Sequence, residues 1–452
     1  MSSTTPRRDW TKGSVGGSLW GFSWPIIVSQ SLGMMGPTID MIWVGKLGSA
    51  AVAGVGVSSM VVQIMSSLGM GLFTGLRVMV SRFVGAGDTE GANHVMQQAF
   101  VISGAFFVFS VTVGLLFTEQ ILGVFGVAPE VLTEGAAYMR IMLAGMVTMS
   151  MLRISESSMQ ASGDSVTPMR ISVFYRLLHV VLVPFLIFGW WIFPRLGVSG
   201  AALTNVISQA LGGGLGLWFL FSGRTQLKPT LRNFHLDRSI IWRMVKVGIP
   251  SAITGIQRTF PYLVLVWFVS PFGTVALAAY QLTRRIAGFI MNPASSLGRS
   301  TGILAAQNLG AGQSDRAERS GWLAMGFYTA AAMIVSVAVW FWAEGVISIF
   351  STEPDLVEVA ATFLRIQIVS YLLFGVVVVL SMCVEGSGDT FPIMLATLLS
   401  MWLVQFPLGY FLTQVSGIGP YGVQWAIIGA LAARGTFFAI YFRMGRWKHK
   451  EV

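Results

Sequence analysis

Apolar segments long enough to cross a bilayer follow one another along almost the whole chain, which excludes a water-soluble core. Hydrophobic residues make up 54% of the sequence and charged residues only 11%, whereas about a quarter of the residues in soluble proteins are charged. A hydropathy scan with a window of about nineteen residues finds twelve segments, at 19–44, 50–80, 95–117, 135–161, 169–190, 199–222, 242–270, 275–305, 321–343, 356–383, 392–412 and 421–443. The sequence therefore predicts an all-α integral membrane protein with twelve transmembrane helices.

The positively charged residues indicate on which side of the membrane each loop lies. With a cytoplasmic N-terminus, the outside loops hold only Lys46 and Arg195, whereas the inside segments hold Arg7, Arg8, Lys12, Arg82, Arg224, Lys228, Arg232, Arg238, Arg316, Arg319, Arg446, Lys448 and Lys450. By the positive-inside rule we expect a multi-pass protein of the plasma or inner membrane with both termini in the cytoplasm. The net charge of +10 is spread over these loops and forms no single patch, so we expect no nucleic-acid partner.

The chain contains two copies of one unit, because several residues recur 225 positions later: Pro25 as Pro250, Gly48 as Gly273, Gly85-Ala86-Gly87 as Gly310-Ala311-Gly312, Arg140 as Arg365, and Ser162-Gly163-Asp164 as Ser387-Gly388-Asp389. Each copy has an even number of spans, so the repeats are parallel and a substrate site is expected between them near the midplane. The predicted organisation is a cytoplasmic tail at 1–18, a six-helix N-lobe at 19–222, a cytoplasmic linker at 223–241, a six-helix C-lobe at 242–445 and a cytoplasmic tail at 446–452.

An ordered set of motifs gives the chain a family resemblance. The run 39–48 (IDMIWVGKLG) ends the first span, 84–88 (VGAGD) follows the second, 161–165 (ASGDS) follows the fourth, and Gly200-Ala201-Ala202 opens the sixth. With the second-half echoes of the glycine loops, this set resembles the multidrug and toxic compound extrusion (MATE) transporters, and within them the DinF-like branch. The resemblance covers nearly the whole chain. It implies a V-shaped pair of lobes that alternates between inward-open and outward-open states and exchanges a drug-like or lipidic substrate for protons or sodium ions.

Asp40 is the leading candidate for cation coupling. An ionisable side chain inside a bilayer costs roughly 2.5–3.5 kcal/mol on insertion scales, so such residues are usually functional. Asp40 and Glu156 are the two acids that fall clearly within predicted spans, and both lie in the first half. Asp40 also matches the cation-binding aspartate of the MATE family, which implies that it takes up a proton or binds Na⁺. The alternative is a carboxylate near the helix end that snorkels to the interface.

Two prolines precede Asp40 in the first predicted span. Pro25 and Pro37 are expected to bend or break this helix, and the carbonyl groups left without an N–H partner can act as ligands or mark hinges. Because Pro25 recurs as Pro250, it favours an architectural role, whereas Pro37 favours a functional one.

The fourth predicted span carries two further candidates. Tyr138 and Glu156 are 18 residues apart, which is five turns of a continuous helix, so they are expected to share one face. Tyr138 matches a tyrosine of the MATE family's N-lobe polar network, although a buried core tyrosine is the alternative. Glu156 is expected to face the substrate cavity, and a local ion pair with Arg153 is the alternative.

The fifth predicted span departs from the family pattern, which often has an Asn followed four residues later by an Asp before a proline. Here His179 and Val183 occupy those places. Arg176 and His179 fall on one helix face with Val183. We assign Arg176 to the substrate cavity and His179 to cation coupling, because an imidazole titrates near neutral pH; a satisfied core histidine is the alternative. Asn205 in the sixth span is the remaining polar candidate. So few anionic oxygens suit a proton better than Na⁺.

The second half carries arginines within its predicted spans instead of acids. Arg258, Arg284 and Arg285 stand where the first copy has Gly33, Ser59 and Met60. They predict a basic cavity for anionic or zwitterionic compounds. The alternative is that Arg284 and Arg285 snorkel or pair locally.

These features predict a secondary antiporter that exports small organic or lipidic compounds in exchange for H⁺ or Na⁺, as a monomer and without a cofactor. A flippase for lipids or lipid-linked oligosaccharides is the nearest alternative. No HExxH, Walker or Gly-x-Ser-x-Gly motif is present, so we expect no enzyme activity. Gly85-Ala86-Gly87 is too short to bind phosphate and is expected to end a helix. A channel is disfavoured because no ring of charged residues is visible.

The predicted topology can be tested with reporter tags. A tag placed after Val452 and one inserted near Leu231 should both be cytoplasmic, because both follow an even number of spans. Labelling of tagged cells with a membrane-impermeant reagent would measure this. Labelling of either tag from outside would contradict the twelve-span topology.

Overall fold

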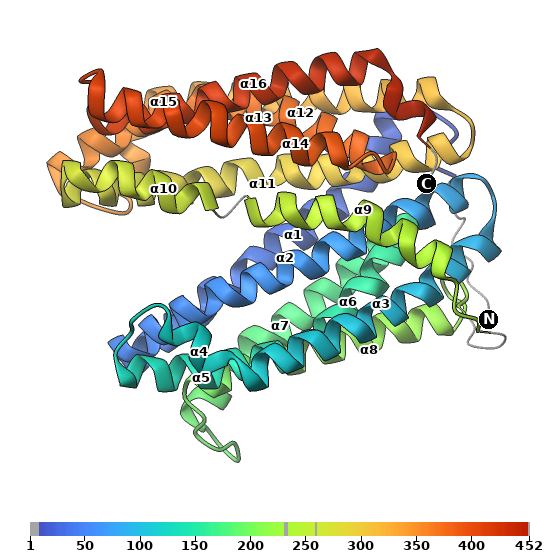
Figure 1. Ribbon diagram of the computed structural model, residues 1–452, viewed down its shortest axis with the longest axis horizontal. Coiled ribbons are helices and arrows are strands. Elements are labelled where there is room, and N and C mark those ends of the chain that lie inside the picture. The colour runs from blue at the N-terminus through green and yellow to red at the C-terminus, as the bar shows by residue number, and fades with distance from the viewer. Residues whose placement is uncertain (1–8, 230–233, 258–259, 451–452) are drawn as a thin grey trace. The chain divides into compact units, whose positions relative to one another are not determined.

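The computed structural model describes residues 9–229, 234–257 and 260–450, and every regular element in these ranges is a helix (Figure 1). The first half contains α1 (Val15–Val44), α2 (Ser49–Gly85), α3 (Thr89–Leu116), α4 (Thr118–Gly123), α5 (Pro129–Ala144), α6 (Met146–Ala161), α7 (Val166–Phe188) and α8 (Val198–Phe221). The second half contains α9 (Arg238–Gln257), α10 (Phe260–Val269), α11 (Thr274–Gly310), α12 (Ser314–Ser348), α13 (Pro354–Gly386), α14 (Phe391–Leu399), α15 (Phe406–Tyr410) and α16 (Gly422–Met444).

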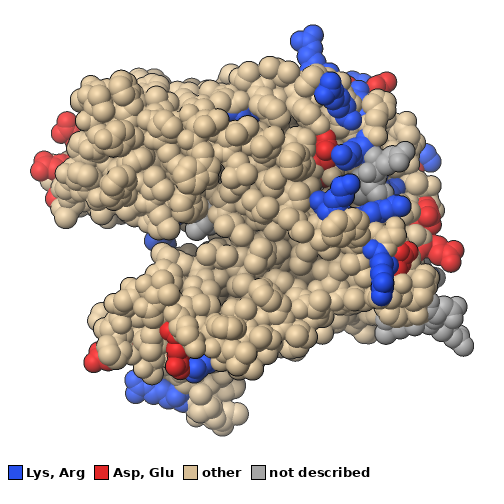
Figure 2. Space-filling view, in the orientation of Figure 1, with Lys and Arg blue, Asp and Glu red and all other residues tan. Residues whose placement is uncertain are grey.

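Most of these helices are long and apolar enough to cross a membrane. Within the described ranges, eight helical stretches pass this test, and the bent pair α5 and α6 makes a ninth. Three further helices, α1, α8 and α11, have 30, 24 and 37 residues, and their glycine and polar residues lower their hydropathy. Together these elements account for the twelve predicted spans. Figure 2 shows that the helix flanks in each unit are almost free of charged side chains on the face drawn, and that charges gather at helix ends.

The helix boundaries repeat between the two halves at the spacing that the sequence predicts. Helices α2 and α11 both have 37 residues. The residue pairs that begin or end equivalent elements are Ser49 and Thr274, Gly85 and Gly310, Thr89 and Ser314, Pro129 and Pro354, Ala161 and Gly386, and Val166 and Phe391. The prediction of two pseudo-symmetric copies is therefore confirmed at the level of single residues.

The repeated glycine loops end helices, as predicted. Gly87 and Gly312 have φ angles of +78° and +73°, which a residue with a side chain adopts at a cost. The amide of Asp88 donates to the Phe83 carbonyl at 2.9 Å, so the chain closes the end of α2 and turns into α3. The Asp88 side chain then caps α3 by accepting from the Gly91 amide at 2.8 Å.

The chain divides into two compact units, and the division does not fall in the linker. One unit contains residues 24–252 and the other contains 10–23 with 253–452. Most of α9 belongs to the first unit because it packs closely on α2: a Cβ atom on Gly71 would lie 2.5 Å from the Cβ of Ala252. The compact units therefore group residues 19–23 of the predicted N-lobe with the second half of the chain, and residues 242–252 of the predicted C-lobe with the first half. This exchange was not visible in the spacing of apolar segments.

The start of α1 belongs to the second unit through contacts with α12. The Arg316 guanidinium donates to the carbonyls of Gly13 at 2.8 Å and Lys12 at 3.0 Å. A Cβ atom on Gly16 would contact the Phe327 ring at 3.6 Å. At the other end of the chain, Trp447 is fully buried, so residues 446–449 of the predicted C-terminal tail form a short helix that packs on the second unit.

Two predictions about individual spans are corrected. Helix α1 continues through Pro25 and Pro37, so neither proline breaks it. The fourth span is not one continuous helix, because α5 and α6 are bent by 42° at Gly145. A Cβ atom on Gly145 would lie 2.2 Å from the side chain of Val206 on α8, so glycine allows close packing at the bend. The equivalent helix of the second unit, α13, runs without interruption.

Candidate functional site

The Asp40 carboxylate lies inside the first unit, where α7 and α8 bring polar side chains to it. Asp40 is 5% exposed and His179 is 1% exposed. The His179 Nε2 lies 2.8 Å from Asp40 Oδ1. Asn205 Nδ2 lies 3.5 Å from Asp40 Oδ2. Both carboxylate oxygens therefore face a nitrogen, and the alternative of a carboxylate that snorkels to the interface does not describe this site.

The contact between α1 and α7 follows from helix periodicity and one glycine. Gly36 and Asp40 are one turn apart on α1, and Arg176 and His179 are one turn apart on α7, so each pair shares a face. A Cβ atom on Gly36 would lie 2.3 Å from Arg176 Nη1. Glycine thus provides the space for the guanidinium beside α1. The guanidinium carbon of Arg176 also lies 4.9 Å from the centre of the Tyr175 ring.

The surroundings of the pair are apolar. Tyr138 and Val183 belong to one buried hydrophobic cluster with Val44, Ala51, Val55, Ile187, Val198, Ala201 and Ala202. Tyr138 is 6% exposed, interacts electrostatically with Asp40 and shares a hydrogen bond with Ser59. A carboxylate in such surroundings is destabilised unless it is protonated or paired. The Asp40 carboxylate therefore depends on the polar side chains of its own unit for its partners.

Only one of the two ring nitrogens of His179 has a hydrogen-bond partner among the described residues. Among the described residues its Nδ1 atom has no hydrogen-bond partner, although the ring is buried. A proton on Nδ1 would be an unsatisfied buried donor, which costs about 1–3 kcal/mol. The favoured tautomer of a neutral ring therefore carries its proton on Nε2, directed at Asp40 Oδ1.

The polar chain continues from Asn205 to a small cavity inside the same unit. Gln209, one turn further along α8, donates its Nε2 to Asn205 Oδ1 at 2.5 Å. Both residues line a cavity with Ser66, Met142, Gly145, Met146, Met149 and Val206. It has about 20 Å³ of room for water, which holds roughly one molecule, whereas drug-sized ligands need about 300 Å³ or more. This cavity can hold a water molecule beside Asn205 and Gln209, but it is too small for a drug-sized compound.

Glu156 lies in a second polar group on α6 and α7. Its Oε2 lies 3.3 Å from Arg153 Nη1, and its Oε1 accepts from the Ser172 hydroxyl at 3.0 Å. The local ion pair that was the alternative to a cavity role is therefore present. Because α5 and α6 are bent at Gly145, the argument that Tyr138 and Glu156 share one continuous helix face is wrong.

The basic residues of the second half are only partly described. Arg258 lies outside the described residues. Arg284 and Arg285 are exposed, and the guanidinium carbon of Arg284 lies 3.8 Å from the centre of the Tyr262 ring. The Tyr262 hydroxyl accepts from Gln281 Nε2 at 2.6 Å. Arg284 is therefore held by an aromatic neighbour of its own unit, and no acidic partner is recorded for Arg284 or Arg285 among the described residues.

Sequence reasoning did not identify Gln209, Ser172 or the Met-rich cavity. Gln209 follows Asn205 by four residues and could have been found by helix periodicity. Ser172 and the methionines carry no such signal, because serine and methionine are ordinary packing residues in membrane helices.

Comparison with known proteins identifies the family. The MatE family model matches residues 25–185 and again 250–411, so the two matches begin at Pro25 and Pro250, the prolines that recur between the repeats. The chain belongs to the MATE family of membrane transporters. The two matches together cover well over half of the sequence. Since this family consists of transporters, the protein is a multi-pass membrane transporter and not an enzyme.

Relatives of this MATE transporter match over nearly their full length. The probable multidrug resistance protein YoeA of Bacillus subtilis is 26% identical over 98% of this chain and 96% of its own. The probable multidrug resistance protein NorM of Thermotoga maritima is 22% identical, covering 95% and 92% of the two chains. An FAD transporter of Shewanella oneidensis is 22% identical over 84% of each.

Solved structures confirm the two-lobe fold. A crystal structure of a MATE protein in the straight conformation matches with a TM-score of 0.91, at 22% identity and over 98% of both chains. An outward-facing multidrug resistance MATE transporter matches with a TM-score of 0.90, with the same identity and coverage.

The pairing of Asp40 with His179 should be visible as non-additivity. We expect Asp40→Asn and His179→Gln each to lower the free energy of unfolding, because each leaves a buried polar group with a poorer partner. The double variant should be more stable than the sum of the two changes by about 1–3 kcal/mol. Denaturation of the purified protein in detergent would measure this.

A matched control is Asp88→Asn combined with His179→Gln. Asp88 is exposed and caps α3, and asparagine is an equally good N-cap residue, so this combination should be additive. Additivity to within about 0.5 kcal/mol for the Asp40 and His179 pair would contradict the interaction.

Proposed function

We propose that this MATE transporter is an antiporter that exports small organic, drug-like compounds in exchange for protons, with Asp40 and His179 as the coupling pair. The observation that carries the proposal is the buried contact of 2.8 Å between Asp40 Oδ1 and His179 Nε2 in an apolar unit. A carboxylate and an imidazole at hydrogen-bond distance can share, gain and lose one proton without a large rearrangement.

The neighbours of Asp40 favour a proton over a sodium ion. Sodium prefers several oxygen ligands, as other hard cations do. Here His179 and Asn205 present nitrogen atoms to the carboxylate, and the Asn205 oxygen accepts from Gln209. The oxygens that could complete a sodium site are therefore turned away or already bonded. The tyrosine hydroxyl of Tyr138 is the remaining polar neighbour, and it supports the same network.

Coupling requires that protonation change the preference between two conformations. When Asp40 is ionised, it needs the donors on α7 and α8, and the helices are held together around it. When Asp40 is protonated, its hold on these donors weakens. Exchange of one proton can therefore alter the packing of α1 against α7 and α8 and, through it, the affinity for substrate. Neither step requires a bound cofactor or metal.

The helices that join the two units are candidates for the hinge. The chain passes between units at residues 23–24 on α1 and 252–253 on α9, beside Pro25 and Pro250. A proline leaves one carbonyl of the preceding turn without its helical partner, which makes bending easier. We infer that these prolines act as repeat-related hinges, and that Pro37 adds flexibility near Asp40.

The substrates are inferred from relatives and from the basic residues. Relatives include probable multidrug resistance proteins and an FAD transporter, and FAD is an anion. Arg284 and Arg285 are exposed, and Arg176 lies beside α1. We infer that the substrates are amphipathic compounds, including anionic ones, and we propose Glu156, Arg176, Arg258, Arg284 and Arg285 as residues that contribute to substrate binding. The distribution of Lys and Arg supports a plasma-membrane protein with both termini in the cytoplasm, and we propose that it works as a monomer. No observation supports the flippase alternative.

Asp40→Asn should abolish uphill export while leaving the protein folded. Asparagine has nearly the shape of aspartate, but it cannot take up a proton. Proteoliposomes with an imposed proton gradient and ethidium as substrate would measure export. Exchange of one ethidium cation for one proton moves no net charge, so a difference of one pH unit drives an accumulation of about tenfold, and the variant should show none. Glu156→Gln should have a milder effect.

The control is again Asp88→Asn, which removes a carboxylate outside the coupling pair and keeps the cap of α3. It should export as the unsubstituted protein does. If Asp40→Asn still exports uphill under a proton or a sodium gradient, coupling lies elsewhere. If export by the unsubstituted protein follows only the sodium gradient, the proton proposal is wrong.

Neutralising the second-half arginines should change selectivity. We expect Arg258→Gln, Arg284→Gln and Arg285→Gln together to shift the ratio of anionic to cationic dye transport by roughly fivefold, because each exposed charge contributes up to about 1 kcal/mol. Arg365→Gln is the control, since Arg365 pairs with Glu344 near a helix end at 2.9 Å. An unchanged ratio at equal protein levels would show that these arginines only snorkel or pack.

A further inference from the structure

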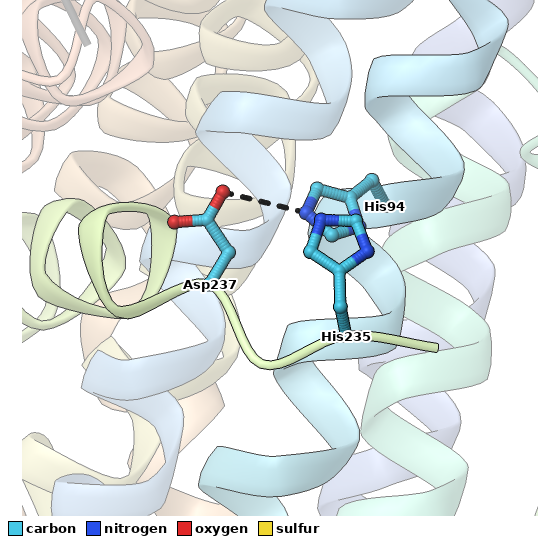
Figure 3. Close-up of side chains that lie close together, drawn as sticks. All are labelled: His94, His235 and Asp237. Carbon is cyan, nitrogen blue, oxygen red and sulfur yellow. Dashed lines mark hydrogen bonds and ion pairs between the residues drawn. The ribbon is translucent and has the colours of Figure 1, made fainter. Parts of the chain in front are cut away.

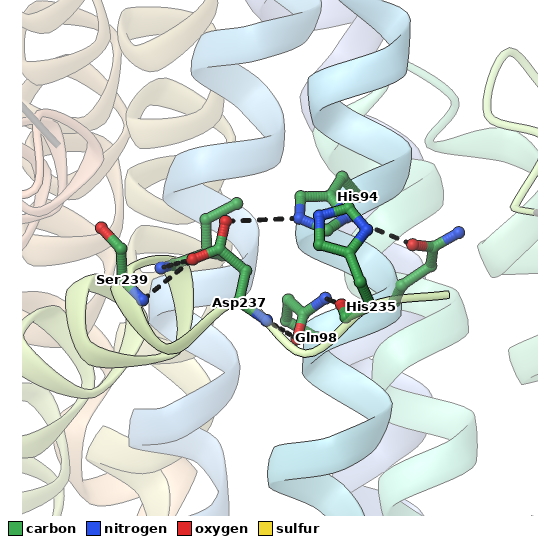
Figure 4. A network of polar contacts seen from close by, with 7 residues as sticks. His94, Gln98, His235, Asp237 and Ser239 are labelled. Carbon is green, nitrogen blue, oxygen red and sulfur yellow. Dashed lines mark hydrogen bonds and ion pairs between the residues drawn. The ribbon is translucent and has the colours of Figure 1, made fainter. Parts of the chain in front are cut away.

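A second polar cluster joins α3 to the segment before α9, far along the sequence from the coupling pair. Figure 4 shows that Gln98 on α3 holds this segment at two points. Its Nε2 donates to the His235 carbonyl at 2.8 Å, and its Oε1 accepts from the Asp237 amide at 3.1 Å. These bonds fix the backbone at 235–237 against the first turns of α3.

The two oxygens of the Asp237 carboxylate make different contacts. Oδ1 accepts from the amides of Ser239 at 2.9 Å and Ile240 at 3.1 Å, and so caps the N-terminus of α9. Oδ2 faces His94 Nε2 at 3.4 Å. The hydrogen bond from the Ile240 amide, assisted by His94, holds the pKa of Asp237 below its ordinary value. Near neutral pH this carboxylate is therefore an anion with one oxygen directed at an imidazole.

The imidazole rings of His94 and His235 lie against each other beside this carboxylate. The rings of His94 and His235 are stacked with centres 4.4 Å apart and planes 25° apart (Figure 3). One ligand atom from each of His94, His235 and Asp237 can be chosen so that all lie within 4.8 Å of one another. Two of the chain's four histidines thus lie beside one carboxylate at a helix terminus.

The separations fit a tetrahedral metal site. Zinc lies about 2.0–2.2 Å from histidine nitrogens and carboxylate oxygens, so two ligands of a tetrahedral ion are about 3.3 Å apart. The distance of 3.4 Å between His94 Nε2 and Asp237 Oδ2 matches this edge. One ligand atom from each of the three residues lies within 4.8 Å of the others, so binding of the ion requires the His235 nitrogen to approach to about 3.3 Å of the other two ligands.

We propose that His94, His235 and Asp237 bind a divalent transition metal of the Zn²⁺ class. Two imidazoles and one carboxylate are the ligand set of an open zinc site, and water completes the coordination. The site fastens the start of α9 to α3. The chain passes from the first unit into the second along α9. The bound metal would therefore fix the N-terminus of this connecting helix.

The test uses the purified full-length transporter in detergent, with a tag that contains no histidine and after removal of metals with a chelator. Zn²⁺ alone is titrated by calorimetry and by competition with a zinc indicator. We expect one ion per chain, with a Kd in the micromolar range or tighter. His94→Gln and His235→Gln should each weaken binding at least tenfold. Affinity should fall below about pH 6.5, because protonated imidazoles cannot bind metal.

Two variants distinguish the loss of a metal ligand from unfolding of the protein. Asp237→Asn keeps the cap of α9, because asparagine is an equally good N-cap, but removes the anionic ligand, so it should weaken Zn²⁺ binding while unfolding is unchanged. His449→Gln removes a histidine from the C-terminal turn and should leave binding unchanged. Hydrogen exchange at residues 234–240 should slow with Zn²⁺ in the unsubstituted protein and not in His94→Gln.

Three results would overturn the proposal. One is the absence of saturable binding at millimolar Zn²⁺. Another is equal affinity in the double variant His94→Gln with His235→Gln, and the third is loss of binding in His449→Gln. In any of these cases the cluster is only a hydrogen-bonded joint, whose His94 and Asp237 pair strengthens when the imidazole is protonated.

Discussion

The interior of a bilayer provides no hydrogen bonds, so a carboxylate placed there must find its partners within the protein. Asp40 meets this requirement through His179 on α7 and Asn205 on α8. Gly36, one turn before Asp40, gives Arg176 room beside α1. Three helices therefore pack around one ionisable group, which is why we propose this group as the coupling site.

The repeat shows how one scaffold can hold a polar site in one copy and an apolar core in the other. The residues equivalent to Asp40 and Tyr138 are Leu265 and Phe363, 2% and 0% exposed in one hydrophobic cluster of the second unit. Helix boundaries agree between the copies, whereas the bend at Gly145 occurs in the first copy only. The shared pattern of glycines and apolar segments determines the backbone geometry of both copies. The polar site of the first copy depends on individual residues that differ between them.

Helices α1 and α9, which connect the two units, are each attached to the protein at their N-termini. Helix α1 begins among residues of the second unit, and α9 begins among residues of the first. Arg316 attaches the segment before α1 through backbone carbonyls, and Gln98 with Asp237 attaches the segment before α9. Prolines follow both attachments.

The sequence by itself determined the membrane class, the twelve spans and the twofold repeat, because hydrophobicity and glycine turns are local properties with a fixed period. It also singled out Asp40, since an acid in an apolar span is costly wherever it points. Only the tertiary structure decided its partners. His179 lies 139 residues away, and from the sequence a satisfied core histidine was an equally reasonable interpretation. The bend at Gly145 and the meeting of His94 with Asp237, 143 residues apart, were also decided there. Such contacts depend on which helices pack together, and no local pattern records that choice.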